Sequence, residues 1–218
     1  MRRRRLPRPN GPRLGRRAER HAGRARVPPE RIELGAVVLR RLTPDDANAL
    51  SEAATTTLDH LAPWMPWATP AGISVETQRD RLLRAEGTWS ARGGYEYGIF
   101  FRADDALVGG CGLHKRIGPR ALEIGYWVHV DYIRLGIATA SAAALTTAGF
   151  EVRGIERIEI RCDEANRASA AVPAKLGYQL TGTIEHTPEA PGEVGRRLVW
   201  AIHRREWLAR TQGEGSEP

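Results

Sequence analysis

The sequence predicts one α/β domain with a mixed central sheet of six to seven strands flanked by helices. Its 218 residues suit a single globular domain, and 41% hydrophobic residues together with 23 glycines give the apolar share of a protein that buries a core. Strand-like and helix-like segments alternate along the chain, which is typical of the α/β class. The expected order is a strand, two helices, three strands, a helix, a strand, a helix and two strands.

The two ends of the chain lack the pattern of folded elements. Residues 1–29 hold 11 Arg and one acidic residue, Glu19, so the net charge of +7 belongs to this segment and the rest of the chain is mildly acidic. An Arg-, Pro- and Gly-rich run with almost nothing apolar to bury is expected to stay disordered. We therefore predict a disordered tail over residues 1–30, a folded domain over 31–210 and a disordered C-terminal end over 211–218.

The Arg-rich tail has two interpretations. Its charge could neutralise phosphates and give weak association with RNA or the ribosome, although it carries no aromatic residues or motif for sequence-specific reading. Alternatively, translation starts later, for example at a codon now read as Val27, and the tail is an artefact of the assigned start.

The rest of the composition excludes several classes of protein. Cys111 and Cys162 are too few for a disulfide framework and lack the spacing of a zinc site, so no metal is expected. The sequence contains no uninterrupted apolar run of membrane-spanning length and no signal-peptide pattern. A cytoplasmic protein without a membrane partner is the expectation.

The first folded elements are a strand that begins at Ala36 and two helices. Residues 43–46 (Thr-Pro-Asp-Asp) supply a capping hydroxyl, a proline in the first turn and acids near the positive helix end. Apolar residues at steps of three and four over 47–61 give this helix one buried face. Ser74 caps the second helix, which Gly93 and Gly94 end.

The later elements follow from alternating hydrophobicity and turn residues. Asp104-Asp105 and Gly118-Pro119 separate three strands of an antiparallel meander. The expected elements are strands over 95–102, 106–117 and 121–130, a helix over 135–150, a strand over 155–162, a helix over 166–176, and strands over 177–185 and 196–203.

The most informative segment is a strand that runs into a glycine-containing loop and then a helix, over residues 123–139. Free backbone N–H groups and the positive dipole end at a helix start attract phosphate. Gly136 and Ala138 keep large side chains away from this point. The pattern indicates an anion site, although a small residue at a tight turn is also ordinary packing.

Three motifs in this region resemble the GNAT superfamily of acyl-CoA-dependent N-acetyltransferases, in particular the ribosomal-protein-alanine N-acetyltransferases. They are residues 134–139 (Arg-Leu-Gly-Ile-Ala-Thr), 123–127 (Glu-Ile-Gly-Tyr-Trp), and 166–169 (Asn-Arg-Ala-Ser) leading to 175–178 (Lys-Leu-Gly-Tyr). The resemblance covers residues 36–207, which makes the folded part an acyl-CoA N-acyltransferase domain.

The resemblance implies acetyl-CoA as co-substrate, with its pantetheine along Trp127 and Val128. Ile133 and Val130 depart from the residues usual in the family, Gln or Arg and Pro respectively, which removes one polar contact but leaves the backbone cradle. The residues implied to hold its pyrophosphate through backbone amides are Arg134, Leu135, Gly136, Ile137, Ala138 and Thr139.

Glu123 is the candidate general base for the acceptor amine. Strand alternation places it with Gly125, Trp127 and His129 on the face opposite an apolar one, and the glycine leaves room beside it. The alternative is a solvated or salt-bridged glutamate. A glutamate at this strand position often serves as base in the family.

Ser169 is the candidate acid for the departing thiolate, or a hydrogen-bond partner of CoA. Asn166 is expected to cap the helix over 166–176 and to be a CoA contact, although Asn and Ser at a helix start are also ordinary capping residues. Tyr178 is an alternative acid, or else a core residue.

The loop over residues 62–67 is the expected wall of the acceptor site. Trp64 and Trp67 are held there between prolines and could line a groove for a peptide or an amine, or alternatively cover the core. Glu185, His186 and Glu189 could flank the same groove. Both cysteines are expected to be packed inside as apolar residues, since no motif gives them a histidine partner.

The function expected is transfer of the acetyl group of acetyl-CoA to a primary amine by direct attack in a ternary complex. A protein N-terminus of ribosomal type is the favoured acceptor because of the branch resembled, and a small amine or antibiotic is the alternative. A different class is an acyl-CoA- or RNA-binding module without efficient catalysis. A homodimer through the C-terminal strands is an expectation from the family.

Overall fold

The structure is a computed structural model that describes residues 27–213. One sheet has the strand order β1-β2-β3-β4-β5-β6-β8-β7, and β5 and β6 are its one parallel pair in the described part of the chain. The mixed α/β sheet predicted from the sequence is confirmed, with eight strands instead of six to seven. The strands are β1 (Arg31–Leu34), β2 (Val37–Arg41), β3 (Gly94–Phe101), β4 (Leu107–His114), β5 (Ala121–Val128), β6 (Arg157–Asp163), β7 (Gln179–Glu185) and β8 (Arg196–His203).

The strand that the sequence did not predict is β1, at one edge of the sheet. Its charged residues alternate with Ile32 and Leu34, which pack on the core, and Gly35 at φ +73° turns the chain into β2. The predicted tail falls outside the described residues up to residue 26. Residues 27–30, which we assigned to the tail, contact the domain: the Tyr97 hydroxyl donates to the Pro29 carbonyl at 2.8 Å.

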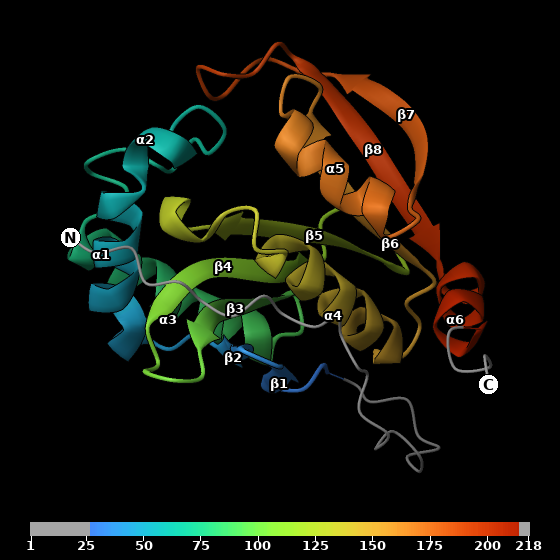
Figure 1. Cartoon of the computed structure of the whole chain (residues 1–218), viewed down its shortest axis with the longest axis horizontal. Coiled ribbons are helices and arrows are strands. Elements are labelled where there is room, and N and C mark those ends of the chain that lie inside the picture. The colour runs from blue at the N-terminus through green and yellow to red at the C-terminus, as the bar shows by residue number, and fades with distance from the viewer. Residues whose placement is uncertain (1–26, 214–218) are drawn as a thin grey trace.

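Helices cover both faces of the sheet (Figure 1). On one face α1 and α3 pack against Val38 and Phe100, and on the other α4 packs against Leu122 and Ile124. The helices are α1 (Ala47–Thr56), α2 (Leu58–Leu61), α3 (Val75–Ser90), α4 (Ile137–Glu151), α5 (Arg167–Lys175) and α6 (Arg204–Gly213), with short 3-10 turns at Pro44–Asp46 and Val130–Tyr132.

Capping side chains lie at the helix starts that the sequence predicted. Ser74 Oγ accepts the N–H of Thr77 at 3.2 Å, and Asp46 Oδ2 accepts the N–H of Thr43 at 2.8 Å in a capping box. The single helix expected over 47–61 is divided into α1 and α2 at Thr57, whose buried hydroxyl accepts the N–H of Val130. This contact with a distant loop has no signal in the local pattern.

The C-terminal helix α6 was not predicted. It extends to Gly213, whereas we predicted a disordered end from residue 211. Trp207 anchors it: the side chain is buried, and its indole N–H donates to Thr147 Oγ1 of α4 at 3.1 Å.

The feature that positions the site is the divergence of the two parallel strands. β5 and β6 pair from Ala121 opposite Arg157 to Ile124 opposite Ile160. Beyond these residues β5 continues to Val128 and β6 to Asp163, but the two strands no longer pair with each other. Backbone groups on the facing edges are therefore left free where the sheet opens.

Candidate active site

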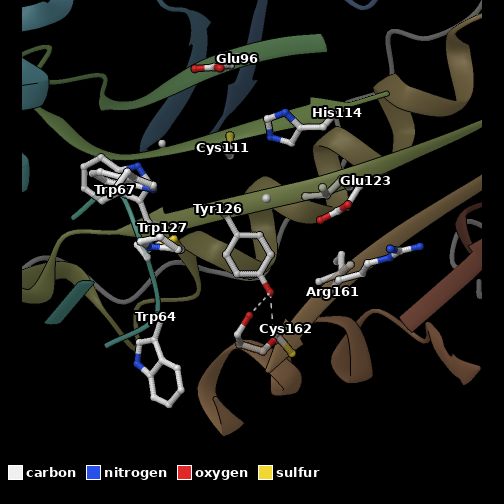
Figure 2. A pocket seen from close by; sticks show the side chains of 18 of the residues that line it. Trp64, Trp67, Glu96, Cys111, His114, Glu123, Tyr126, Trp127, Arg161 and Cys162 are labelled. Carbon is white, nitrogen blue, oxygen red and sulfur yellow. Dashed lines mark hydrogen bonds between the residues drawn. The ribbon is translucent and has the colours of Figure 1, made fainter. Parts of the chain in front are cut away.

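A cavity of about 770 Å³ opens at the point where β5 and β6 separate. Figure 2 shows Glu123, Tyr126 and Trp127 from β5 on one side of it and Arg161 and Cys162 from β6 on the other. Residues of β4, of α5, of the loop after α2 and of the β7–β8 loop complete its wall.

A hydroxyl pair lies on the α5 side of the cavity. The Tyr126 hydroxyl donates to the Ser169 carbonyl at 3.0 Å and lies 3.3 Å from Ser169 Oγ. Burial raises the pKa of Tyr126 well above its usual value, against a smaller lowering by the hydrogen bond with Ser169. Asn166 Oδ1 accepts the N–H of Ser169 at 3.0 Å, so the predicted cap holds the serine in place, and both residues line the cavity.

Glu123 lies on the opposite side of β5, in the cavity wall. Its carboxylate accepts two hydrogen bonds from Arg116, at 2.7 and 3.0 Å, and the residue as a whole is 7% exposed. This bond raises the pKa of the Arg116 guanidinium above its usual value. The salt-bridged alternative that the sequence left open is therefore present together with the cavity position.

An aromatic wall stands at one end of the cavity. Trp64 and Trp67 from the loop after α2 line it together with Trp127, and the rings of Trp67 and Trp127 are 6.1 Å apart. A Cβ on Gly110 would lie 2.6 Å from Nε1 of Trp127. The glycine therefore lets the indole of Trp127 lie flat on β4.

The β7–β8 loop closes the same end. Asp163, the last residue of β6, accepts the N–H groups of Val194 and Gly195 at 3.1 Å with Oδ2 and that of Ala165 at 2.9 Å with Oδ1. Further along the loop, the N–H of Gly192 donates to the Pro63 carbonyl at 2.8 Å, which joins it to the tryptophan loop. Asp163 thereby fixes one wall of the cavity.

Asp163→Asn should lower the free energy of unfolding by about 2 kcal/mol, because an amide cannot replace a carboxylate that accepts several backbone N–H groups. Burial alone would raise the pKa of Asp163, but these hydrogen bonds hold it below the usual 3.8. Its stabilisation is therefore complete above pH 4 and is lost as the pH falls through the lowered pKa. Denaturant unfolding at pH 7 and pH 3 measures this. Asp59→Asn, at an exposed position of α2, is the control, and equal stability of the two variants at pH 7 would contradict the prediction.

The loop before α4 leaves backbone N–H groups free at the start of the helix. Gly136 has φ +81° and Arg134 φ +64°, and the N–H groups of Ile137, Ala138 and Thr139 belong to the first turn of α4, where no helical acceptor exists. Arg134 and Leu135 are exposed, whereas the side chains of Val128 and Ile137 are buried in the core. Any ligand contact of Val128 would therefore use its backbone.

Most of the elements that form the cavity and the α4 loop belong to a part of the chain that matches one protein-family model. A model of the "Acetyltransferase (GNAT) domain" matches residues 36–179, a span that includes the strand divergence, the α4 loop and α5. The chain belongs to the GNAT acetyltransferase family. It is an acyltransferase, as the sequence predicted.

Relatives of this GNAT protein include enzymes with ribosomal names. It is 28% identical over 174 residues to "Putative ribosomal N-acetyltransferase YdaF" of Bacillus subtilis (strain 168), covering 78% of this chain and 93% of the relative. It resembles the structure of Mycobacterium smegmatis RimJ in complex with CoA-disulfide (25% identity, TM-score 0.71, 82% of this chain and 89% of that one). The structure of RimL, the ribosomal L7/L12 alpha-N-protein acetyltransferase, in complex with coenzyme A shares the fold. Its sequence identity is 23% and its TM-score 0.73, and the match covers 80% of this chain and 98% of that one.

Three other residues considered in the sequence analysis are buried, and none of them has surroundings that favour ionisation of its side chain. Tyr178 is buried and its hydroxyl lies 2.6 Å from Thr146 Oγ1, so it is a core residue and not an acid. Cys111 and Cys162 are buried thiols at the cavity wall, and burial raises the pKa of both above their usual value. Within residues 27–213 no group of metal-ligating side chains is assembled, and no helix has the length and apolar character to cross a bilayer.

Sequence reasoning missed Tyr126 and His114, which both line the GNAT cavity. Tyr126 alternates with Gly125 and Trp127, so the pattern puts it on the apolar face of its strand, and its hydroxyl was the signal that could have singled it out. His114 lies at the end of β4 and carries no motif.

Proposed function

We propose that this protein transfers the acetyl group of acetyl-CoA to a primary amine by direct attack in a ternary complex. The observation that carries the proposal is the cavity between the diverging strands, which has the Tyr126–Ser169 hydroxyl pair on one side and charged and aromatic side chains on the other. A transferase of this kind needs a proton donor for the leaving thiolate and a proton acceptor for the amine. In this proposal, one side of the cavity supplies the proton donor and the other side supplies the proton acceptor.

The chain has suitable groups for acetyl-CoA. Trp127 and the backbone of Val128 border the widening strand gap, and the free N–H groups of residues 137–139 suit a pyrophosphate. The co-substrate supplies an activated acyl group. Arg134, Leu135 and Gly136 shape the loop at the anion end, and Asn166 adds a polar contact through the α5 side.

Tyr126 is the group that we give the acid role, with Ser169 as its partner. A phenol that burial keeps protonated can donate to a thiolate at any pH near neutrality. Ser169 holds the Tyr126 hydroxyl in position through its carbonyl and its own hydroxyl.

The acceptor we propose is a protein N-terminus, with Trp64 and Trp67 along its first residues. The support is the ribosomal name of the Bacillus relative and the names of RimJ and RimL among the structural neighbours. Glu123 also lies in the cavity wall, and its negative charge attracts an ammonium group before that group loses its proton.

A screen by mass spectrometry tests the function. The full chain is incubated with acetyl-CoA and a set of peptides with different N-terminal residues, together with polyamines, amino acids and aminoglycosides. A mass increase of one acetyl group at the α-amine of a peptide is expected. Acetylation confined to small amines would replace the acceptor, and acetyl-CoA binding without any product would favour a binding module.

Glu123→Gln should lower kcat/KM for the acceptor by about 10- to 100-fold while leaving acetyl-CoA affinity unchanged. The variant removes the negative charge beside the amine and leaves Arg116 without its partner, and each such charged contact is worth about 1.5–3 kcal/mol. Initial rates and calorimetric binding of acetyl-CoA measure the two effects. Glu156→Gln, at a position outside the cavity wall, is the control, and near-normal kcat/KM of the Glu123 variant across pH would remove this residue from the mechanism.

A further inference from the structure

A histidine occupies the sheet face of the cavity opposite the Tyr126 hydroxyl. His114 is the last residue of β4 and lies directly across from Glu123 of β5 in the antiparallel register. Its ring lines the cavity, and Figure 2 shows it on the strand next to the one that carries Glu123 and Tyr126. Cross-strand partners of this kind have side chains on the same face of the sheet.

Two glycines give the His114 ring its access to the cavity. A Cβ on Gly112 would lie 3.1 Å from Nε2 of His114, and one on Gly125 would lie 3.5 Å from the same atom. A side chain at position 112 would therefore crowd the Nε2 edge of the ring, and one at position 125 would lie in contact with it. Within residues 27–213, no protein group is hydrogen-bonded to either nitrogen of this imidazole, so Nε2 can accept a proton from a bound molecule.

The charges around His114 set its protonation. Burial is the main cause that lowers its pKa below the usual 6.5, and Arg116 after β4 and Arg81 of α3 act in the same direction. Glu96 of β3 and Glu123 oppose this shift. The imidazole is therefore neutral at pH 7, and the two carboxylates beside it stabilise the cation formed when it takes a proton.

We infer that His114 is the general base of the transfer reaction, an inference that rests on the proposed function. The amine nitrogen forms a bond to the thioester carbonyl carbon and the carbon–sulfur bond breaks, while Nε2 of His114 takes the amine proton. The leaving thiolate takes the hydroxyl proton of Tyr126. His114 and Tyr126 return to their starting forms by proton exchange through solvent, so atoms and charges balance.

Glu123 has a different part in this scheme. Both of its oxygens already accept hydrogen bonds from Arg116, so its carboxylate is held in place and partly neutralised. We assign it the stabilisation of the protonated His114 and the attraction of the ammonium group. The sequence offered only Glu123 of β5 as a base, because the pairing of His114 with this residue comes from the strand register.

The test is the pH dependence of kcat in His114→Gln, measured with the acceptor that the screen identifies. The wild type should lose kcat as the pH falls through the lowered pKa of His114, below 6.5. The pH profile of kcat should also change near pH 7.7–8.0, where the α-amine of the acceptor titrates, and this second limb of the profile should remain in every variant. We expect His114→Gln to lower kcat about 100-fold at pH 7 and to abolish the limb below 6.5, with acetyl-CoA affinity retained. His203→Gln, at an exposed position outside the cavity, is the matched control.

Two further measurements guard against a merely structural effect. In His114→Ala, added imidazole should restore part of kcat, because it supplies the missing base. In the wild type, NMR titration of His114 should give the same pKa as the kinetic limb. An unchanged pH profile in His114→Gln, absence of imidazole rescue in folded His114→Ala, or a mismatch of the two pKa values would overturn the inference. Absence of any product with the wild type would instead refute the proposed function.

Discussion

Tyr126→Phe should lower kcat about 100-fold at pH 7, with little change in the affinity for acetyl-CoA. The variant removes the hydroxyl that bonds Ser169 and that we assign to the departing thiolate, and general acid catalysis is worth about 100- to 10,000-fold. Because burial raises the pKa of Tyr126 above the usual 10, the wild type should keep its activity at pH 10, where an ordinary phenol is half ionised. Steady-state rates between pH 7 and 10 give both quantities.

The chain offers a matched control for this variant. Tyr178→Phe also removes a buried hydroxyl, the one that bonds Thr146 in the core, and each lost hydrogen bond costs about 1 kcal/mol of folding stability. Similar stabilities with a large difference in kcat would assign the hydroxyl of Tyr126 to the chemistry. Equal kcat values in the two variants would remove Tyr126 from the acid role and leave Ser169, tested by Ser169→Ala, as the candidate.

Gly136→Val should weaken acetyl-CoA binding by about 10- to 100-fold. The backbone of Gly136 is left-handed at φ +81°, a conformation that costs an ordinary residue about 1–2 kcal/mol and a β-branched one more. Nothing lies within 4 Å of an added Cβ, so the effect is conformational and not a clash. A loop that relaxes to negative φ moves the N–H groups of the first turn of α4 away from the anion, and each tenfold loss corresponds to about 1.4 kcal/mol.

Gly154→Val separates strain from binding. Gly154 has φ +87° in the turn between α4 and β6, and its Cβ position is equally open, but it does not belong to the cradle. Both variants should lose similar stability in denaturant unfolding, and only Gly136→Val should raise the dissociation constant for CoA in calorimetry. Unchanged CoA binding by Gly136→Val would contradict the assignment of the pyrophosphate to this loop.

Local signals explain why much of the fold and part of the candidate site could be predicted. Period-two alternation placed Glu123 and Trp127 on the same face of β5, and both residues line the cavity. The Asn166 cap needs only the N–H of a residue three positions later, so its type and position were sufficient.

What could not be predicted depends on distant partners. Arg116 engages Glu123 only because the chain after β4 turns back beside β5, and His114 meets Glu123 only through the strand register. Tyr126 counted as apolar because the gap beyond Ile124, which exposes its hydroxyl to a cavity, arises from the divergence of β5 and β6. In the same way, α6 depends on the burial of Trp207 against α4.

The backbone bond between Gly192 and Pro63 joins two parts of the cavity wall. It links the β7–β8 loop to the tryptophan loop, two segments more than a hundred residues apart in the chain, and both loops contribute residues to that wall. A Cβ on Gly192 would lie 2.6 Å from the Pro63 carbonyl oxygen, so a larger residue would separate the two loops. For the transfer that we propose, the shape of the wall along the acceptor therefore depends on a single glycine.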